Sequence, residues 1–135
     1  MNTPSLRPSP SVLLVDDDDF LRDIMCEMLM QLGVTNIHQA GDGLQALSTL
    51  RALPTPPDFL ICDIYMPDMD GIEFVAELAK LHYRGGVLLL SGVNPETLQL
   101  ARDIANGEGI QLVGAYLKPI RPELLADALG LTPAT

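Results

Sequence analysis

Cysteine is scarce in this sequence, which argues against a disulfide framework or a cysteine-based metal site. Cys26 and Cys62 are the two cysteines of the chain, and both lie in apolar segments without metal-ligand spacing. A thiol in such a segment packs as a small hydrophobic side chain, so we expect both to be buried and reduced. His38 and His82 are isolated as well, and we expect surface or partly packed side chains rather than metal ligands or phosphate carriers.

Positive charge is also scarce. The 135 residues contain 8 Lys and Arg against 18 Asp and Glu, which gives a formal net charge of −10. Nucleic-acid binding needs a positive stripe that contacts phosphates, so this domain is not expected to bind nucleic acid directly. A cluster of acids is instead expected to attract a divalent cation.

Long apolar runs are missing, although 47% of the residues are hydrophobic. Runs of only a few residues cannot span a membrane, and no signal peptide is recognisable, so we expect a cytoplasmic protein. Residues 1–10 are rich in proline without an apolar core and are expected to form a disordered leader. Residues 11–130 can form one domain, and residues 131–135 are expected to be a tail or the start of a linker.

Short apolar runs predict strands that are buried on both faces, as in a parallel sheet covered by helices. They occupy residues 12–15, 59–62, 88–90 and 116–117, with a further strand near 36–39 and the last strand extending over 110–117. Apolar residues at steps of three and four predict five helices between and after the strands. This alternation predicts an α/β fold with a doubly wound, five-stranded parallel sheet.

The predicted helices have apolar inner faces. These are Phe20, Leu21, Ile24, Met25, Met28, Leu29 and Leu32; Leu44, Ala46, Leu47 and Leu50; Phe74, Val75, Leu78, Ala79 and Leu81 or His82; Leu98, Ala101, Ile104 and Ala105; and Leu124, Leu125, Ala128 and Leu129. Asp18 or Asp19 is placed to cap the first helix, Gly33 to end it, and Asn94 to cap the fourth.

Polar side chains follow four of the predicted strands. The acids of residues 16–19 follow the first strand, Asp63 the central one, Ser91 the next, and Lys118 the last. Because parallel strands share one carboxyl edge, where open α/β sheets bind ligands, we expect these groups to converge on one cleft. Taken alone, each has a simpler explanation as a turn, a helix cap or a solvated surface residue.

The order of these motifs resembles the receiver domain of bacterial two-component response regulators. An acid pair, a single acid followed by the sequence Met-Pro-Asp-Met-Asp-Gly, a hydroxyl after an apolar strand and a Lys-Pro pair occur in that order between residue 12 and about residue 129. The resemblance implies a flavodoxin-like (βα)5 receiver fold. It also implies a signalling switch rather than an enzyme, which accepts a phosphoryl group from a sensor histidine kinase or phosphotransfer protein and then changes its interaction surface.

The resemblance also implies roles for individual residues. Asp63 would be the phospho-acceptor, and Asp16, Asp17 and Asp63 would bind Mg²⁺ together with the backbone carbonyl of Tyr65. Lys118 would contact one phosphoryl oxygen as a point charge. Ser91 would hydrogen-bond another phosphoryl oxygen. Asp63, Ser91 and Lys118 would together form the catalytic set. The Lys118–Pro119 bond is a candidate cis peptide, because the family often uses one.

Two features depart from the family pattern. An aromatic residue usually lies three positions before the lysine, but this sequence has Ala115 there. Tyr116 is adjacent and is expected to face the other side of the sheet, since strand side chains alternate. The long segment between Ser91 and Lys118 is similar to that of receivers joined to cyclic-di-GMP phosphodiesterase (EAL-type) output domains. An output domain or effector of that type is therefore a further expected partner.

The lifetime of the phosphate depends on the residues beside it. Tyr65 and Val93 lie two positions beyond Asp63 and Ser91, where receiver side chains flank the path of the hydrolytic water. Neither side chain has a carboxylate or an amide that could orient the attacking water, and both are bulky enough to shield the phosphorus, so slow self-dephosphorylation is expected.

Two other functions fit part of the pattern. A haloacid-dehalogenase-type phosphatase also uses a strand-end Asp with Mg²⁺, but it needs an Asp-x-Asp motif after its first strand and a longer chain. A phosphorylation-independent interaction module has no physical need for the acids together with Ser91 and Lys118.

Overall fold

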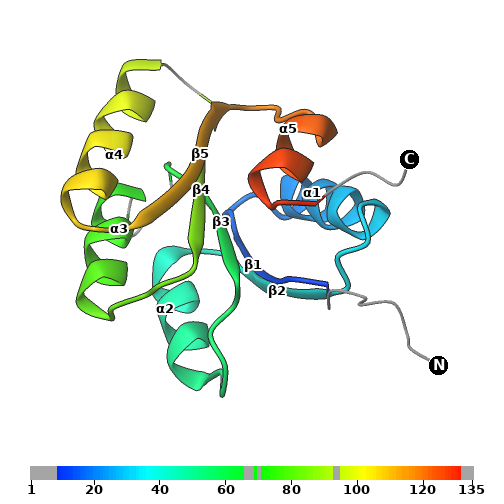
Figure 1. Ribbon diagram of the computed structural model, residues 1–135, viewed down its shortest axis with the longest axis horizontal. Helices are drawn as coiled ribbons and strands as arrows, with labels where there is room; N and C mark the ends of the chain where they lie inside the picture. Colours follow the sequence, from blue (N-terminus) through cyan, green and yellow to red (C-terminus); the bar gives the residue numbers. More distant parts are fainter. Residues whose placement is uncertain (1–8, 66–68, 70, 93–94, 132–135) are drawn as a thin grey trace.

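The computed structural model describes residues 9–65, 69, 71–92 and 95–131. Strands and helices alternate along the chain throughout these ranges (Figure 1). Their bounds are β1 Ser11–Val15, α1 Asp19–Gln31, β2 Asn36–Ala40, α2 Gly43–Ala52, β3 Phe59–Asp63, α3 Gly71–Lys80, β4 Gly86–Ser91, α4 Pro95–Gly107, β5 Gln111–Leu117 and α5 Pro122–Ala128. The last strand begins one residue later than predicted, and β2 extends one residue further.

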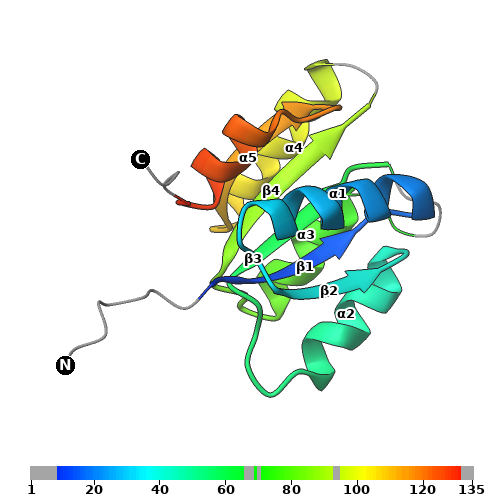
Figure 2. The ribbon, with the colours of Figure 1, turned by 90° about the vertical axis from the view of Figure 1, so that its right-hand side faces the viewer.

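The strands form one parallel sheet in the order β2-β1-β3-β4-β5. Helices α1 and α5 cover one face, and α2, α3 and α4 cover the other (Figures 1 and 2). Because each connection crosses over the sheet through a helix, all strands point the same way and end at the same edge. The doubly wound (βα)5 fold predicted from the sequence is therefore confirmed.

The two faces of the sheet hold two hydrophobic clusters. In β1, Leu13 and Val15 belong to the cluster under α2, α3 and α4, while Val12 and Leu14 belong to the cluster under α1 and α5. All four side chains are at most 2% exposed. The run therefore has no polar break because both faces of the strand are buried, as expected for a central parallel strand.

Helix ends follow from local side-chain hydrogen bonding. Asp18 caps α1 by accepting hydrogen bonds from the backbone N–H groups of Phe20 and Leu21 at 3.0 and 3.2 Å. Asp42 caps α2 in the same way, accepting from Gln45 N at 2.8 Å. Gly33 follows α1 with a φ of +94°, a conformation that glycine adopts without steric cost. The predicted cap at Asn94 lies outside the described residues.

The helix faces predicted from spacing were too wide. Phe20, Ile24, Leu44, Leu81 and Leu124 were predicted to point inward, but they are 71%, 42%, 57%, 38% and 36% exposed. The alternative to Leu81, His82, is exposed as well. A helix lying on a sheet buries a stripe roughly 100° wide, and apolar residues at the border of that stripe stay in solvent. The buried centre of α1 is correspondingly narrow, with Met25 and Leu29 at its middle.

The predictions for the cysteines and histidines can be compared with their burial in the structure. Cys62 is buried as predicted, whereas Cys26 is only partly buried; both are free thiols, and burial raises the pKa of each. His38 is partly buried and His82 is exposed. Within the described ranges, no helix combines the length and apolar character that crossing a bilayer requires. The proposed leader and tail lie largely outside those ranges, so their boundaries stay predictions.

Candidate functional site

Backbone hydrogen bonds extend the sheet just past the formal ends of its strands. Asp16 N donates to Ala40 O at 3.2 Å, and Ile64 N donates to Leu90 O at 2.9 Å. Lys118 N donates to Ser91 O at 2.7 Å. These bonds fix the backbone at the residues that carry the polar side chains. The carboxyl edge therefore holds Asp16, Asp63, Ser91 and Lys118 as a rigid set.

The ammonium group of Lys118 lies between two carboxylates. Lys118 Nζ donates to Asp16 Oδ2 and to Asp63 Oδ2, both at 3.0 Å. The lysine side chain is 19% exposed, and those of Asp16 and Asp63 are 7% and 9% exposed. Although burial acts to lower the pKa of Lys118, the hydrogen bonds and charges of the two aspartates outweigh it and raise the pKa. Lys118 is therefore firmly held as a cation in this cleft.

For Asp63, in contrast to Lys118, burial outweighs the neighbouring charges in setting the pKa. Burial raises the pKa of its carboxyl group, and the hydrogen bond and charge of Lys118 lower it only in part. Tyr65 N also donates to Asp63 Oδ1 at 3.2 Å, and the Asp16 carboxylate acts to raise the pKa further. Since desolvation disfavours a charge, Asp63 gains from any cation or proton that reaches it.

Three carboxylates at this edge could share one metal ion. Oxygen atoms of Asp16, Asp17 and Asp63 lie within 4.8 Å of one another. Asp16 and Asp63 are buried and Asp17 is exposed, so the group opens to solvent on one side. An all-oxygen, carboxylate-rich set suits a hard cation such as Mg²⁺, which keeps several waters when bound. These three aspartates therefore fit the Mg²⁺ ion that the sequence led us to expect.

The four consecutive acids of residues 16–19 have different partners. Asp16 accepts from Lys118 and also from Asp18 N, at 2.9 Å. Asp18 caps α1, and Asp19 pairs with Arg22 at 2.7 Å. Asp17 is left exposed at the cleft. The assignment of Asp18 to capping is confirmed.

Arg22 is a residue that the sequence analysis did not single out. Its guanidinium donates to the backbone carbonyl of Asp16 at 2.7 Å and to Gln39 Oε1 at 3.0 Å. A signal was available, because Arg22 lies three residues after Asp19, a spacing that brings two side chains together on a helix.

The remaining predicted residues take these positions. Ser91 is fully buried at the end of β4, and Tyr65 is 41% exposed just after Asp63. The Lys118–Pro119 bond is cis, as the resemblance implied. Val93 lies outside the described residues.

Ala115 and Tyr116 face opposite sides of the sheet, as predicted. Ala115 belongs to the cluster under α2, α3 and α4, and Tyr116 packs against the cluster under α1 and α5. Gly114 makes room for the ring, because a Cβ there would lie 2.6 Å from Tyr116 Cε2. Position 115, where the family usually has an aromatic side chain, holds only the methyl group of Ala115.

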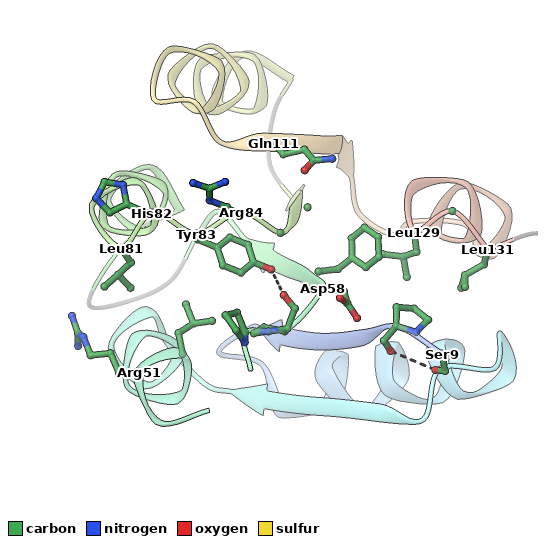
Figure 3. A pocket seen from close by; sticks show the side chains of 18 of the residues that line it. Ser9, Arg51, Asp58, Leu81, His82, Tyr83, Arg84, Gln111, Leu129 and Leu131 are labelled. Carbon is green, nitrogen blue, oxygen red and sulfur yellow. Dashed lines mark hydrogen bonds between the residues drawn. The ribbon is translucent and has the colours of Figure 1, made fainter. Parts of the chain in front are cut away.

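A cavity of about 1120 Å³ lies at the opposite, amino edge of the sheet. It is lined by residues at the start of the strands, including Asp58, Phe59 and Gly86. Arg51, His82 and Arg84 line it as well, and Arg51 lies apart from the other two (Figure 3). The amino edge therefore lacks, among the residues described, a convergent charged cluster like that of Asp16, Asp63 and Lys118 at the carboxyl edge.

The fold and the acidic site with its lysine define a receiver-type domain. The chain belongs to this family, because the family model described as the response regulator receiver domain matches residues 12–129. Receiver domains are signalling switches rather than ordinary enzymes, and this chain is a receiver domain. The family match is to receiver domains, and it gives no support to the alternative of a haloacid-dehalogenase-type phosphatase.

Three relatives illustrate the range of proteins that contain this domain. The chain is 25% identical over 119 residues to the chemotaxis protein CheY of Thermotoga maritima, covering 88% of this chain and 93% of that protein. It is 31% identical over 120 residues to the probable C4-dicarboxylate response regulator DctR of Bacillus subtilis, covering 87% and 50%. It is 36% identical over 87 residues to the sensor kinase CckA of Brucella abortus, covering 64% and 9%. The chain thus spans nearly all of CheY but half or less of the other two.

A solved structure agrees on the fold. A response regulator receiver domain from Clostridium thermocellum superposes with a TM-score of 0.77 at 21% sequence identity, covering 90% of this chain and 91% of that one. At this level of identity the likeness concerns the fold alone.

Proposed function

We propose that the domain is a phosphorylatable switch in which Asp63 accepts a phosphoryl group from a histidine kinase or a phosphotransfer protein. The observation that carries the proposal is the shared ammonium of Lys118, 3.0 Å from both Asp16 and Asp63 within a cluster of three carboxylates. A lone strand-end acid has many uses. A buried acid beside both a fixed cation and a metal-capable oxygen set is suited to phosphoryl transfer, where charge on the phosphoryl oxygens must be offset.

The reaction would proceed by in-line displacement at phosphorus. A carboxylate oxygen of Asp63 forms the new P–O bond while the bond from phosphorus to the donor nitrogen or oxygen breaks, and the leaving group takes the electron pair. Lys118 would shift its contacts from the carboxylates to a phosphoryl oxygen. Bound Mg²⁺ would supply further positive charge, held by Asp16, Asp17, Asp63 and the carbonyl of Tyr65.

Ser91 would report the phosphate to the rest of the domain. Its hydroxyl would hydrogen-bond a phosphoryl oxygen after transfer, and because the residue is fully buried at the end of β4, this movement would shift the strand end. With Ala115 in place of an aromatic residue, that shift would not be coupled to a rotating ring. The altered interaction surface would therefore arise from the backbone after β4.

The partners we propose follow from the family. Response regulator receiver domains interact with histidine kinases and output domains. DctR, twice as long as the matched region, supports a receiver joined to further sequence. We propose an output domain or effector for this chain too, with a cyclic-di-GMP phosphodiesterase type as the candidate, and the cytoplasm as its location.

Binding of beryllofluoride, a phosphoryl mimic, tests this proposal in a purified sample. With MgCl₂ present, ¹⁹F NMR should show bound beryllofluoride on the wild type and none on Asp63→Asn. Asp17→Asn should weaken Mg²⁺ binding. Asp103→Asn is a matched control, because this exposed aspartate on α4 accepts a hydrogen bond only from Gln99 among the contacts described. Absence of binding by the wild type would favour the phosphorylation-independent interaction module.

A further inference from the structure

We propose that Arg22 is a positioning residue that holds the loop between β1 and α1 so that its acids face the cleft. The inference rests on the proposed function, because it concerns the metal-capable carboxylates. The guanidinium makes three hydrogen bonds: to the Asp16 carbonyl at 2.7 Å, to Asp19 Oδ1 at 2.7 Å and to Gln39 Oε1 at 3.0 Å.

These contacts join three elements at one point. Asp16 is the first loop residue after β1, Gln39 lies in β2 and Asp19 begins α1, so the planar guanidinium fastens the loop to β2 and to the helix. The Arg22 side chain is only 16% exposed, which limits its freedom. Since a guanidinium presents its donors in a fixed fork, the three acceptors are held in a fixed arrangement.

The loop needs such support because it contains four consecutive acids. Like charges at this spacing repel, and an unsupported loop would relax by spreading them into solvent. Arg22 neutralises the outermost acid, Asp19, and holds the backbone of the first acid, Asp16. Asp18 is occupied in capping α1, so Asp17 is the acid that stays exposed at the cleft.

Arg22 and Lys118 are both cations near the cleft, but their contacts differ. Lys118 bonds to carboxylate oxygens that belong to the metal-capable set, so it competes with a metal ion for them. Arg22 bonds to the backbone carbonyl of Asp16 and leaves the carboxylates of that set free of its own hydrogen bonds. It therefore resembles an outer partner of a metal ligand, whose loss typically weakens metal binding.

The sign of the change in Mg²⁺ affinity separates positioning from simple electrostatics. Removing a nearby positive charge should by itself tighten binding of a cation. Loss of a positioning residue should weaken it. In Arg22→Gln we expect the Mg²⁺ dissociation constant, measured by calorimetric titration with MgCl₂, to rise about tenfold. Arg22→Lys should weaken binding similarly, because an ammonium keeps the charge but cannot reproduce the planar fork. Arg84→Gln, an exposed arginine at the amino edge, is the control and should bind as the wild type does.

A second readout uses protein without metal. The amide of Asp18 donates to Asp16 Oδ1 at 2.9 Å, and its hydrogen exchange should be faster in Arg22→Gln. Exchange at Ile61, in the centre of β3, should be unchanged, which separates a loosened loop from global unfolding. Unchanged or tighter Mg²⁺ binding in Arg22→Gln, or unchanged Asp18 exchange, would overturn the positioning role. Failure of the wild type to bind Mg²⁺ would instead refute the proposed function, while the exchange measurement still decides the role of Arg22 in the loop.

Discussion

Lys118 and Asp63 are 55 residues apart in the chain, yet the lysine ammonium donates a 3.0 Å hydrogen bond to the aspartate carboxylate. The same ammonium also bonds to Asp16 at 3.0 Å. Both carboxylates belong to the set that could hold a metal ion. Lys118 is therefore well placed to stabilise charge on a phosphoryl group, but it also competes with a divalent cation for the same oxygen atoms.

This relationship predicts opposite effects of Lys118→Ala on two measurements. Phosphorylation by a small phosphodonor should slow by tens-fold, because a charge-assisted contact to the phosphoryl oxygens is worth about 2 kcal/mol. Mg²⁺ affinity should stay the same or increase, because the ammonium no longer opposes the metal. Lys80→Ala is a suitable control, since Lys80 pairs with Glu77 on the surface and is 73% exposed. Weaker Mg²⁺ binding by a folded Lys118→Ala would show that the cleft geometry is wrong.

The pKa of Asp63 gives a second prediction. Burial raises this pKa, so the folded chain holds the proton more tightly than the unfolded chain does. The resulting stabilisation is complete below the unfolded value of about 3.9 and is lost as the pH rises through the higher folded value. NMR titration of the Asp63 carboxyl carbon, in protein treated with a chelator, should give a midpoint above that of an ordinary aspartate. Lys118→Ala should raise it further. A midpoint at or below the ordinary value contradicts the burial argument.

The stability of the phosphorylated form should depend on Tyr65. Its side chain is 41% exposed beside the acceptor and carries no amide or carboxylate to orient the attacking water. Tyr65→Asn should speed loss of the phosphate about tenfold, or about 1.4 kcal/mol of barrier. The rate is followed in Mg²⁺-loaded protein after removal of the donor. Tyr65→Phe, which keeps the bulk, should behave like the wild type. If the wild type lost its phosphate within seconds, or if Tyr65→Asn had no effect, Tyr65 could not be shielding the phosphorus from water.

Gly114 is expected to be needed for the packing of Tyr116. A Cβ at this position would lie 2.6 Å from Tyr116 Cε2 and 2.9 Å from Leu88 Cδ1. Gly114→Ala should therefore lower the free energy of unfolding in denaturant by about 1–3 kcal/mol. Gly107→Ala, at the end of α4 with no atom within 4 Å of the new Cβ, should be neutral or slightly stabilising. Equal stability of the two variants would mean that the ring moves aside freely.

The sequence was sufficient to predict the fold because its signals are strong and local. The apolar runs of β1, β3 and β4 favour strands buried between two helical layers, and a polar residue follows each run. Convergence of Asp16, Asp63 and Lys118 then follows from parallel topology alone. The prediction was weaker for helix faces: spacing identified Met25 and Leu29, but it could not show that Phe20 and Ile24 lie outside the buried stripe.

Arg22 was not anticipated for a different reason. Two of its three acceptors, the Asp16 carbonyl and Gln39, are brought to it by tertiary structure. Its spacing from Asp19 predicts an ordinary surface ion pair, which contributes little. Only the position of β2 beside β1 shows that the same guanidinium links the loop after β1, strand β2 and helix α1.

The central claim is that Asp63 is the phospho-acceptor, and intact-mass spectrometry tests it most directly. The protein is incubated with a small acyl phosphate and MgCl₂, and wild type, Asp63→Asn and Asp103→Asn are compared. We predict the mass of one added phosphoryl group on the wild type and on Asp103→Asn, and none on Asp63→Asn. Undiminished labelling of Asp63→Asn would contradict the claim.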